Sequence, residues 1–316
     1  MEIRQLGASG PYVSVVGLGC NNFGMRLDEK QTADVVGAAL DAGITHFDTA
    51  ETYGGGRSEV FLGKALGARR AEVVLASKFA PRPEGEPYTP GLLRRRILEG
   101  CDNTLRRLGT DHIDLYYQHR PDPVAPVEEV LETLGELVAA GKIKYAACSN
   151  YEARHIEEAA RASAAPGAAR FVACQIHWNL LARQVEQEIV PAILRQSMGI
   201  VPYFPLESGL LSGKYRLGQS PPPGSRLATT ARYAVLATPE NLAYVDRLME
   251  FAVSHDHTLL GLAFAWLAAQ DGVASVIAGA TTRDQVLANV SAGNAWRLSP
   301  EELKDIPARA DSPAAV

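Results

Sequence analysis

Short hydrophobic segments alternate with longer amphipathic ones along most of this chain. The short segments are apolar or alternate between apolar and polar residues, which predicts strands; they span residues 15–19, 44–47, 73–77, 113–117, 144–147, 171–175, 200–203 and 274–278. The longer segments repeat apolar residues at helical spacing. Strands that alternate with helices require a parallel sheet with crossover connections. Eight such strands predict an α/β fold, a (β/α)8 TIM barrel whose active site lies at the C-terminal ends of the strands.

Several helix ends are marked by capping residues. Asp28, with Gln31 three residues later, forms a capping-box pattern at the start of the first helix, and Gly43 ends that helix. Ser58 is predicted to cap the second helix. Pro126 is predicted to open the fourth helix.

Four segments lie outside this alternation. Residues 2–14 contain two short apolar stretches around a turn, which predicts a β-hairpin that closes the floor of the barrel. An extra helix is expected at residues 239–254, within the last connection. Residues 206–237 are too long for a passive turn and are predicted to form a lid over the barrel mouth. We expect one barrel domain over residues 1–306 and a flexible tail over residues 307–316.

Composition narrows the class of protein. The 316 residues are 47% hydrophobic and 21% charged, which is enough to bury one large core. The formal net charge of -5 gives no general attraction to polyanions, so nucleic acid is not an expected partner. The longest uncharged helical stretch, residues 258–270, is too short to span a bilayer, so no membrane is expected either.

Location and oligomeric state are less well indicated. The N-terminal residues lack the apolar core of a signal peptide, which predicts a cytoplasmic protein. The four cysteines form no close pair, which argues against a disulfide framework or a metal site and fits a reduced compartment. The sequence does not indicate an oligomeric state.

Four ionisable residues follow three successive predicted strands. Asp48 and Tyr53 come where the second strand gives way to a loop, Lys78 follows the third strand, and His119 follows the fourth. Because the C-terminal ends of parallel strands meet at one face of a barrel, we expect these side chains to lie together.

Their chemistry suggests proton transfer. An ordinary phenol has a pKa near 10, so Tyr53 can give up a proton near neutral pH only if its phenolate is stabilised. The ammonium of Lys78 would supply that charge and lower the phenol pKa, and Asp48 would keep the ammonium charged and in place. The sequence therefore predicts an acid–base site centred on Tyr53.

These residues and their surroundings resemble a known family. The motifs FDTAETYGGGRSEVFLGKAL, the strand ending in SK, LRRLGTDHIDLYYQHRPDP, GKIKYAACSN and QIHWNLLAR resemble those of the aldo-keto reductases, in particular bacterial members of the branch that includes potassium-channel β subunits. The resemblance extends from Leu6 to Asn289. It implies that Tyr53 donates a proton to a substrate carbonyl while a nicotinamide delivers hydride, and that His119 orients the carbonyl.

The same resemblance implies a set of residues that bind NADP(H), with NAD(H) also possible. Ser149, Asn150 and Gln175 match ligands of the nicotinamide carboxamide, and Tyr203 matches the aromatic residue that stacks on the ring. The expected phosphate and nucleoside contacts come after the seventh and eighth strands, where helix N-termini offer free N–H groups. With Asn21 after the first strand, the remaining expected cofactor residues are Pro205, Leu206, Ser208, Gly209, Leu211, Lys214, Gly279, Thr281, Arg283, Gln285 and Asn289. Ala288 stands where the family commonly has a glutamate that contacts adenine.

The substrate pocket is less well indicated than the cofactor site. Residues next to the strand ends that could form it are Asn22, Phe23, Phe79, Arg120 and Trp178. The aromatic residues would form apolar walls, and Asn22 and Arg120 would be polar handles, so the substrate is expected to be an aromatic or a sugar-derived carbonyl.

Three functions remain open at this point. The protein could be an NADPH-dependent reductase of aldehydes or ketones. It could also be an NAD(P)⁺-dependent sugar or alcohol dehydrogenase, because the same four residues work in both directions. The third alternative is a non-catalytic nicotinamide-binding partner subunit, like the family's channel-associated members. No metal is expected in any of the three.

Overall fold

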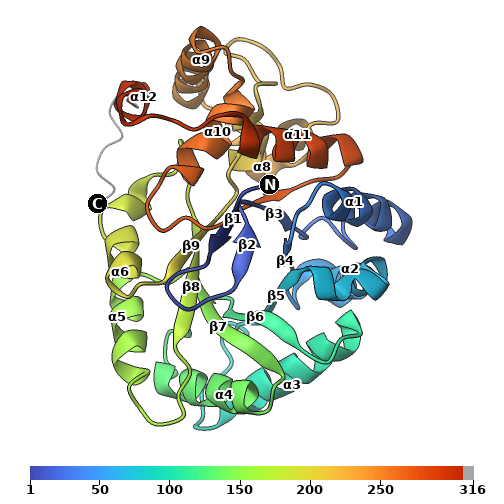
Figure 1. The fold of residues 1–316 in the computed structure, drawn as a ribbon, viewed down its shortest axis with the longest axis vertical. Helices are drawn as coiled ribbons and strands as arrows, with labels where there is room; N and C mark the ends of the chain where they lie inside the picture. Colours follow the sequence, from blue (N-terminus) through green and yellow to red (C-terminus); the bar gives the residue numbers. More distant parts are fainter. Residues whose placement is uncertain (309–316) are drawn as a thin grey trace.

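The computed structural model of this protein describes residues 1–308, and the rest of the predicted tail, residues 309–316, lies outside the described residues. Within the described chain, eight parallel strands close into a barrel in the order β10-β3-β4-β5-β6-β7-β8-β9. Figure 1 shows the helices around these strands. This is the predicted (β/α)8 TIM barrel.

The barrel strands agree with the predicted segments to within two residues at each end. They are β3 (Val16–Gly19), β4 (His46–Asp48), β5 (Val74–Phe79), β6 (Ile113–Gln118), β7 (Ile143–Ser149), β8 (Phe171–His177), β9 (Gly199–Tyr203) and β10 (Val276–Gly279).

Helices follow most of the strands and cover the outside of the barrel. They are α1 (Glu29–Asp41), α2 (Arg57–Leu66), α3 (Leu92–Leu108), α4 (Val127–Ala139), α5 (Ala153–Ala162), α6 (Ile189–Arg195), α7 (Arg226–Thr229), α8 (Ala231–Ala234), α9 (Pro239–Ser254), α10 (Leu259–Ala268), α11 (Arg283–Ala295) and α12 (Pro300–Asp305). The extra helix α9 has the predicted bounds. Among residues 1–308, no helix combines the length and apolarity needed to cross a bilayer.

The capping predictions were partly right. Asp28 and Gln31 form the predicted capping box at the start of α1. Ser58 does not cap α2, because that helix starts one residue earlier and Gly56 is its N-cap. The Ser58 hydroxyl donates instead to the carbonyl of Cys20, which ties α2 to the loop after β3.

The predicted N-terminal hairpin is present and closes one end of the barrel. Strands β1 (Ile3–Gln5) and β2 (Tyr12–Ser14) pair antiparallel and lie over the centre of the ring of helices in Figure 1. Leu6 and Val13 pack against the inward-facing residues of the barrel and are fully buried. A Cβ on Gly199 would lie 2.5 Å from the backbone N of Gly7, so the close docking of the hairpin requires glycine there.

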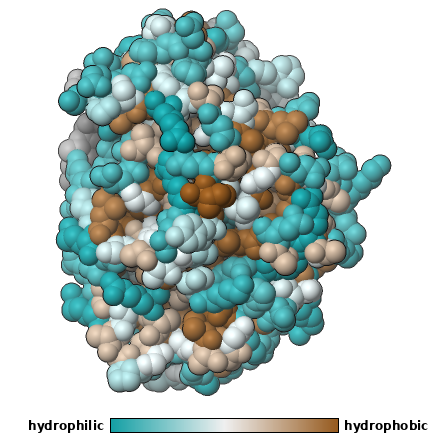
Figure 2. Space-filling view, in the orientation of Figure 1, coloured by the Kyte–Doolittle hydropathy of each residue, from teal (hydrophilic) through white to brown (hydrophobic). Residues whose placement is uncertain are grey.

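On the face shown in Figure 2, hydrophobic residues form small groups separated by hydrophilic ones.

Candidate active site

A cavity of about 620 Å³ opens at the C-terminal ends of the barrel strands. Asp48, Tyr53 and His119 line this cavity. Lys78 lies beneath them and is fully buried. The structure thus brings together the four residues that the sequence singled out, because three neighbouring strands, β4, β5 and β6, end side by side.

Lys78 connects the acid and the phenol. Its Nζ lies 2.6 Å from Oδ2 of Asp48 and 3.4 Å from Oη of Tyr53, and it also donates to the carbonyl of Thr49 at 2.8 Å. Asp48 is held from the other side, because Gln175 donates from Nε2 to its Oδ1 at 2.9 Å. The ammonium is therefore paired and aimed at the phenol, and it contacts little else.

Burial and charge set the protonation states of these groups. Burial raises the pKa of Tyr53 above its usual value near 10, and the Lys78 ammonium opposes this rise. The sequence had predicted a net lowering, but loss of hydration outweighs the ammonium, so Tyr53 is protonated at neutral pH. Burial would lower the pKa of Lys78, but the Asp48 carboxylate and Tyr53 outweigh it and raise the pKa overall.

His119 faces Tyr53 across the cavity. The two rings meet edge to face with centroids 6.0 Å apart. Burial, reinforced by the Lys78 charge, lowers the pKa of His119 from 6.5 to about 4. Its Nδ1 is buried and has no hydrogen-bond partner among the described residues. The imidazole is therefore neutral at pH 7 and can act as a hydrogen-bonding group rather than as a cation.

The expected nicotinamide ligands form one hydrogen-bonded group. Nδ2 of Asn150 donates to the carbonyl of His119 and to the Ser149 hydroxyl, both at 3.0 Å. The Tyr203 hydroxyl donates to Oδ1 of Asn150 at 2.7 Å. These contacts connect the ends of β6, β7 and β9, so His119 and the expected stacking residue are held by the same asparagine.

A strained turn follows Tyr203. Phe204, Glu207 and Ser208 all have positive φ angles, of 53°, 41° and 56°, which non-glycine residues rarely adopt. The Glu207 carboxylate holds this turn, because it lies 2.8 Å from Nε2 of His177 and accepts a hydrogen bond from Nδ2 of Asn179. Asn179 also donates to the carbonyl of Phe204 at 2.9 Å.

His177 supports the turn in a second way, because its ring stacks on Tyr203 with centroids 5.4 Å apart and planes 13° apart. Sequence reasoning missed His177 and Glu207. An alternating pattern continued beyond Gln175 would have placed His177 on the inner face of the barrel.

Most of the expected cofactor residues line the cavity. They are Asn21, Ser149, Asn150, Gln175, Tyr203, Pro205, Leu206, Ser208, Gly209, Lys214, Gly279, Thr281, Gln285 and Asn289.

Two expected cofactor residues do not reach the cavity. Leu211 is fully buried in the hydrophobic core. Arg283 is the first residue of α11, where its exposed side chain lies outside the cavity lining. A phosphate contact by Arg283 therefore stays a prediction.

Two arginines that sequence reasoning missed line the cavity instead. Arg226, from the predicted lid, reaches across the mouth and donates to Oδ1 of Asn22 at 3.2 Å. Burial and the positive charge of Arg26 lower the pKa of Arg226. Neither arginine forms an ion pair with an acid in the described part of the chain. Two cations that line one cavity without a counter-ion form a site suited to phosphate.

Three aromatic residues predicted as pocket walls are buried elsewhere. Phe23 lies in the hydrophobic core and is fully buried. Phe79 packs on Tyr116 on the outer side of the barrel. Trp178 packs on Trp266 of α10. None of the three lines the cavity, whereas the other two expected pocket residues, Asn22 and Arg120, do.

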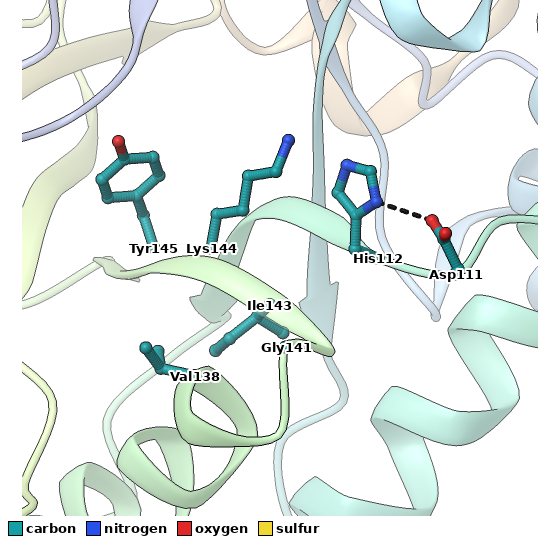
Figure 3. Close-up of a pocket in the computed structure, with 7 residues that line it drawn as sticks. All are labelled: Asp111, His112, Val138, Gly141, Ile143, Lys144 and Tyr145. Carbon is teal, nitrogen blue, oxygen red and sulfur yellow. Dashed lines mark hydrogen bonds and ion pairs between the residues drawn. The ribbon is translucent and has the colours of Figure 1, made fainter.

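A second hollow, of about 590 Å³, lies at the N-terminal ends of β6 and β7 (Figure 3). Its ionisable side chains already have partners: His112 contacts Asp111 at 2.6 Å, and Lys144 pairs with Asp114 at 2.8 Å. In TIM barrels this face contributes to stability rather than to catalysis. We therefore place the candidate active site in the cavity at the opposite face.

Comparison with known proteins identifies the family of this chain. The sequence model of the Aldo/keto reductase family matches residues 15–310. A probable voltage-gated potassium channel subunit beta of Oryza sativa subsp. japonica is 35% identical over 96% of this chain and 95% of its own length. Probable aldo-keto reductase 1 of Glycine max is 34% identical over 96% of this chain and 87% of its own length.

A solved structure also matches the chain as a whole. The holo form of aldo-keto reductase AKR11C1 from Bacillus halodurans has a TM-score of 0.81 and 32% sequence identity, and the match covers 100% of this chain and 98% of that one. Taken with the barrel, the cavity and the four grouped residues, these matches show that the chain belongs to the aldo/keto reductase family and is an NAD(P)H-dependent oxidoreductase.

Proposed function

We propose that this protein reduces an aldehyde or ketone to the alcohol with NADPH, and that Tyr53 is the proton donor. The observation that carries this proposal is the buried chain from Asp48 through Lys78 to Tyr53, which ends at the phenol in the wall of the cavity. Burying a charged lysine costs folding free energy unless an opposite charge pairs with it, and such lysines are common at functional sites. Asp48 is the opposite charge, and the function of Lys78 would be to stabilise the tyrosinate as it forms.

The residues that line the cavity fit a nicotinamide dinucleotide. A Cβ on Gly279 would lie 3.2 Å from Nδ2 of Asn22, so a glycine keeps this part of the cavity open. Ser149, Asn150 and Gln175 would hold the carboxamide, with Tyr203 against the ring. Lys214 and Arg226, with Arg26, would bind the phosphates. When bound, the reduced nicotinamide supplies a hydride to the carbonyl carbon.

The side chains of the protein carry out the remaining steps. Neutral His119 donates a hydrogen bond to the carbonyl oxygen and orients it towards Tyr53. As negative charge develops on that oxygen, the Tyr53 hydroxyl transfers its proton, and the Lys78 ammonium stabilises the tyrosinate that forms. Asp48 keeps the ammonium in place. The raised pKa of Tyr53 ensures that the donor is protonated at the start of the reaction.

We propose NADPH rather than NADH because of the cations in the cavity. Arg26, Lys214 and Arg226 exceed what a pyrophosphate alone requires, which favours a cofactor with an additional 2′-phosphate. A cytoplasmic location is also proposed; the four free cysteines support it, because thiols persist in a reducing compartment.

A measurement of turnover in both directions tests the proposal. The protein should oxidise NADPH with a panel of aldehydes and ketones faster than it reduces NADP⁺ with the matching alcohols at pH 7. Faster alcohol oxidation under the same conditions would favour the dehydrogenase alternative.

The names of the relatives, which call them potassium channel β subunits, favour a second candidate, a non-catalytic partner subunit that binds a nicotinamide. This candidate predicts stoichiometric NADPH binding, measured by fluorescence titration, without turnover on either panel. The intact group of Asp48, Tyr53, Lys78 and His119 favours the enzyme.

A further inference from the structure

Arg120 is a cation without a partner at the reacting end of the cavity. It follows His119 directly, beyond the end of β6, and it lines the cavity with an exposed side chain. Within residues 1–308, no acid lies within ion-pair distance of its guanidinium. The protein itself therefore does not neutralise this charge.

The neighbouring acids are engaged by other residues. Asp122, two residues further along the same loop, accepts two hydrogen bonds from Arg82, at 2.8 and 2.9 Å, and its side chain is only 5% exposed. Its Oδ1 also accepts the backbone N–H groups of Val124 and Ala125. Arg82, which comes from another loop, thus saturates the acid that Arg120 would otherwise pair with.

The charge balance of the whole cavity is positive. Its lining contains Arg26, Arg120, Lys214 and Arg226, but among the described residues that line it the only carboxylate is Asp48. Asp48 does not offset these cations, because buried Lys78 already pairs with it. The cavity is therefore built to receive negative charge.

The other three cations belong to the phosphate end. Arg226 and Arg26 both line the cavity, and the charge of Arg26 adds to the effect of burial in lowering the pKa of Arg226. Lys214 lies beside Gly209, where an added Cβ would be 3.4 Å from its Nζ. Lys214 and Arg226 lie on the segment after β9, and Arg26 lies on the loop after β3, so none of the three comes from the loop after β6 that carries Arg120.

Arg120 stands at the reacting end instead. Its charge acts on His119 and Tyr203: it helps to lower the pKa of His119, and it opposes the rise in the pKa of Tyr203 that burial causes. The His119 ring lies against Tyr53, the proposed proton donor, with the ring centroids 6.0 Å apart. The aromatic walls predicted from the sequence, Phe79 and Trp178, are absent from this end.

We propose that Arg120 binds an anionic group of the substrate, so that the substrate class is an aldehyde or ketone that carries a carboxylate or a phosphate. This inference rests on the proposed function and specifies its substrate. A guanidinium binds either anion through two parallel N–H···O bonds, which a neutral substrate of the same shape cannot form.

The experiment compares a charged and a neutral aldehyde of similar shape. For the wild-type protein, kcat/KM with 4-carboxybenzaldehyde should exceed kcat/KM with 4-nitrobenzaldehyde. Arg120→Gln should reduce that ratio about tenfold to a hundredfold, mainly through KM, and Arg120→Lys should restore part of it. Glyceraldehyde 3-phosphate and glyceraldehyde form a second pair, which shows whether carboxylate or phosphate is preferred.

Arg232→Gln is the matched control, because Arg232 is an exposed lid arginine outside the cavity lining. It should leave both ratios unchanged. Equal ratios in wild type and Arg120→Gln would overturn the assignment, even if neutral aldehydes are reduced well. An equally large fall in Arg232→Gln would also overturn it, because the effect would then come from net charge alone.

A binding measurement separates this inference from the proposed reaction. Calorimetric titration of 4-carboxybenzaldehyde into the complex with NADP⁺ requires no turnover. Binding that is about tenfold or more weaker in Arg120→Gln than in wild type would support the anion site even if no carbonyl is reduced. Equal binding by both proteins would refute it, whatever the activity.

Discussion

Tyr53→Phe tests the centre of the proposed mechanism, because it removes the phenolic hydroxyl and little else. The hydroxyl contacts Lys78 Nζ at 3.4 Å, the long end of the hydrogen-bond range, so its loss should cost about 1 kcal/mol of stability or less. The ring would keep its edge contact with His119 and its position 5.0 Å from the Lys78 ammonium. The folded structure should therefore change very little.

Turnover should change far more than stability. A positioned general acid contributes about 10²-fold to 10⁴-fold to rate, which corresponds to about 3 to 5 kcal/mol of transition-state stabilisation. We expect kcat for NADPH oxidation with a good aldehyde substrate to fall by at least a hundredfold. The NADPH dissociation constant, measured by fluorescence titration, should stay within about twofold of wild type.

Lys78→Met supplies the companion test. It should also reduce kcat strongly, because nothing would then stabilise the tyrosinate, but it leaves buried Asp48 without a counter-charge, which costs about 3 to 5 kcal/mol. The double variant Asp48→Asn with Lys78→Met removes both charges and should recover much of the melting temperature without recovering turnover. Combining Tyr53→Phe with Lys78→Met should be no slower than the worse single variant, because both act on one proton transfer.

A Tyr53→Phe protein that keeps more than about a tenth of wild-type kcat, with hydride transfer rate-limiting, would refute the assignment of Tyr53. His119 would then be the next candidate for the proton donor.

Four further outcomes are expected. Arg226→Ala should weaken NADPH binding about tenfold in fluorescence titrations and reduce its dependence on salt, because one unpaired cation is lost; an unchanged dissociation constant would place the phosphates elsewhere. Glu207→Leu should lower the free energy of unfolding by about 2 to 3 kcal/mol in urea melts, because Asn179 and His177 each lose one hydrogen-bond partner in a buried site, whereas Glu207→Gln should cost less. Burial lowers the pKa of His46 and His119 to about 4, below the value near 6.5 that histidine has in the unfolded chain. As the pH drops, the unfolded state therefore takes up protons before the folded state does, and the free energy of unfolding should fall between about pH 6.5 and pH 4. The fall should be smaller in His46→Gln, which has one buried histidine fewer. Activity should survive dialysis against EDTA, and a loss that only a divalent ion restores would contradict the metal-free mechanism.

The barrel could be predicted from sequence because its strands carry their own signal. Side chains along a strand point alternately into and out of the barrel, and both faces of a barrel strand are buried. The strands therefore appear in the sequence as short apolar segments, which locate each strand to within two residues. Asp48, Lys78 and His119 then reach one face because parallel strands share an edge. That step needs only the fold class and the order of the strands.

The substrate pocket could not be predicted in the same way, because nearness to a strand end does not fix a side chain's direction. Phe79 follows inward-facing Lys78 by one residue and therefore points outward. Trp178 is three residues beyond inward-facing Gln175, so it points outward too. Arg226 was missed for another reason: it lies in a lid segment without periodicity, so only its tertiary contact with Asn22 reveals its place.

The hairpin at the barrel floor has a consequence for the electrostatics of the opposite face. Leu6 and Val13 pack against inward-facing residues such as Leu115 and Tyr117 and complete the apolar filling of the barrel interior. The permittivity around the Asp48–Lys78 pair is therefore low, and each charge there acts more strongly on Tyr53 than it would in a hydrated channel. The strength of the proton donor thus depends partly on a segment that never touches it.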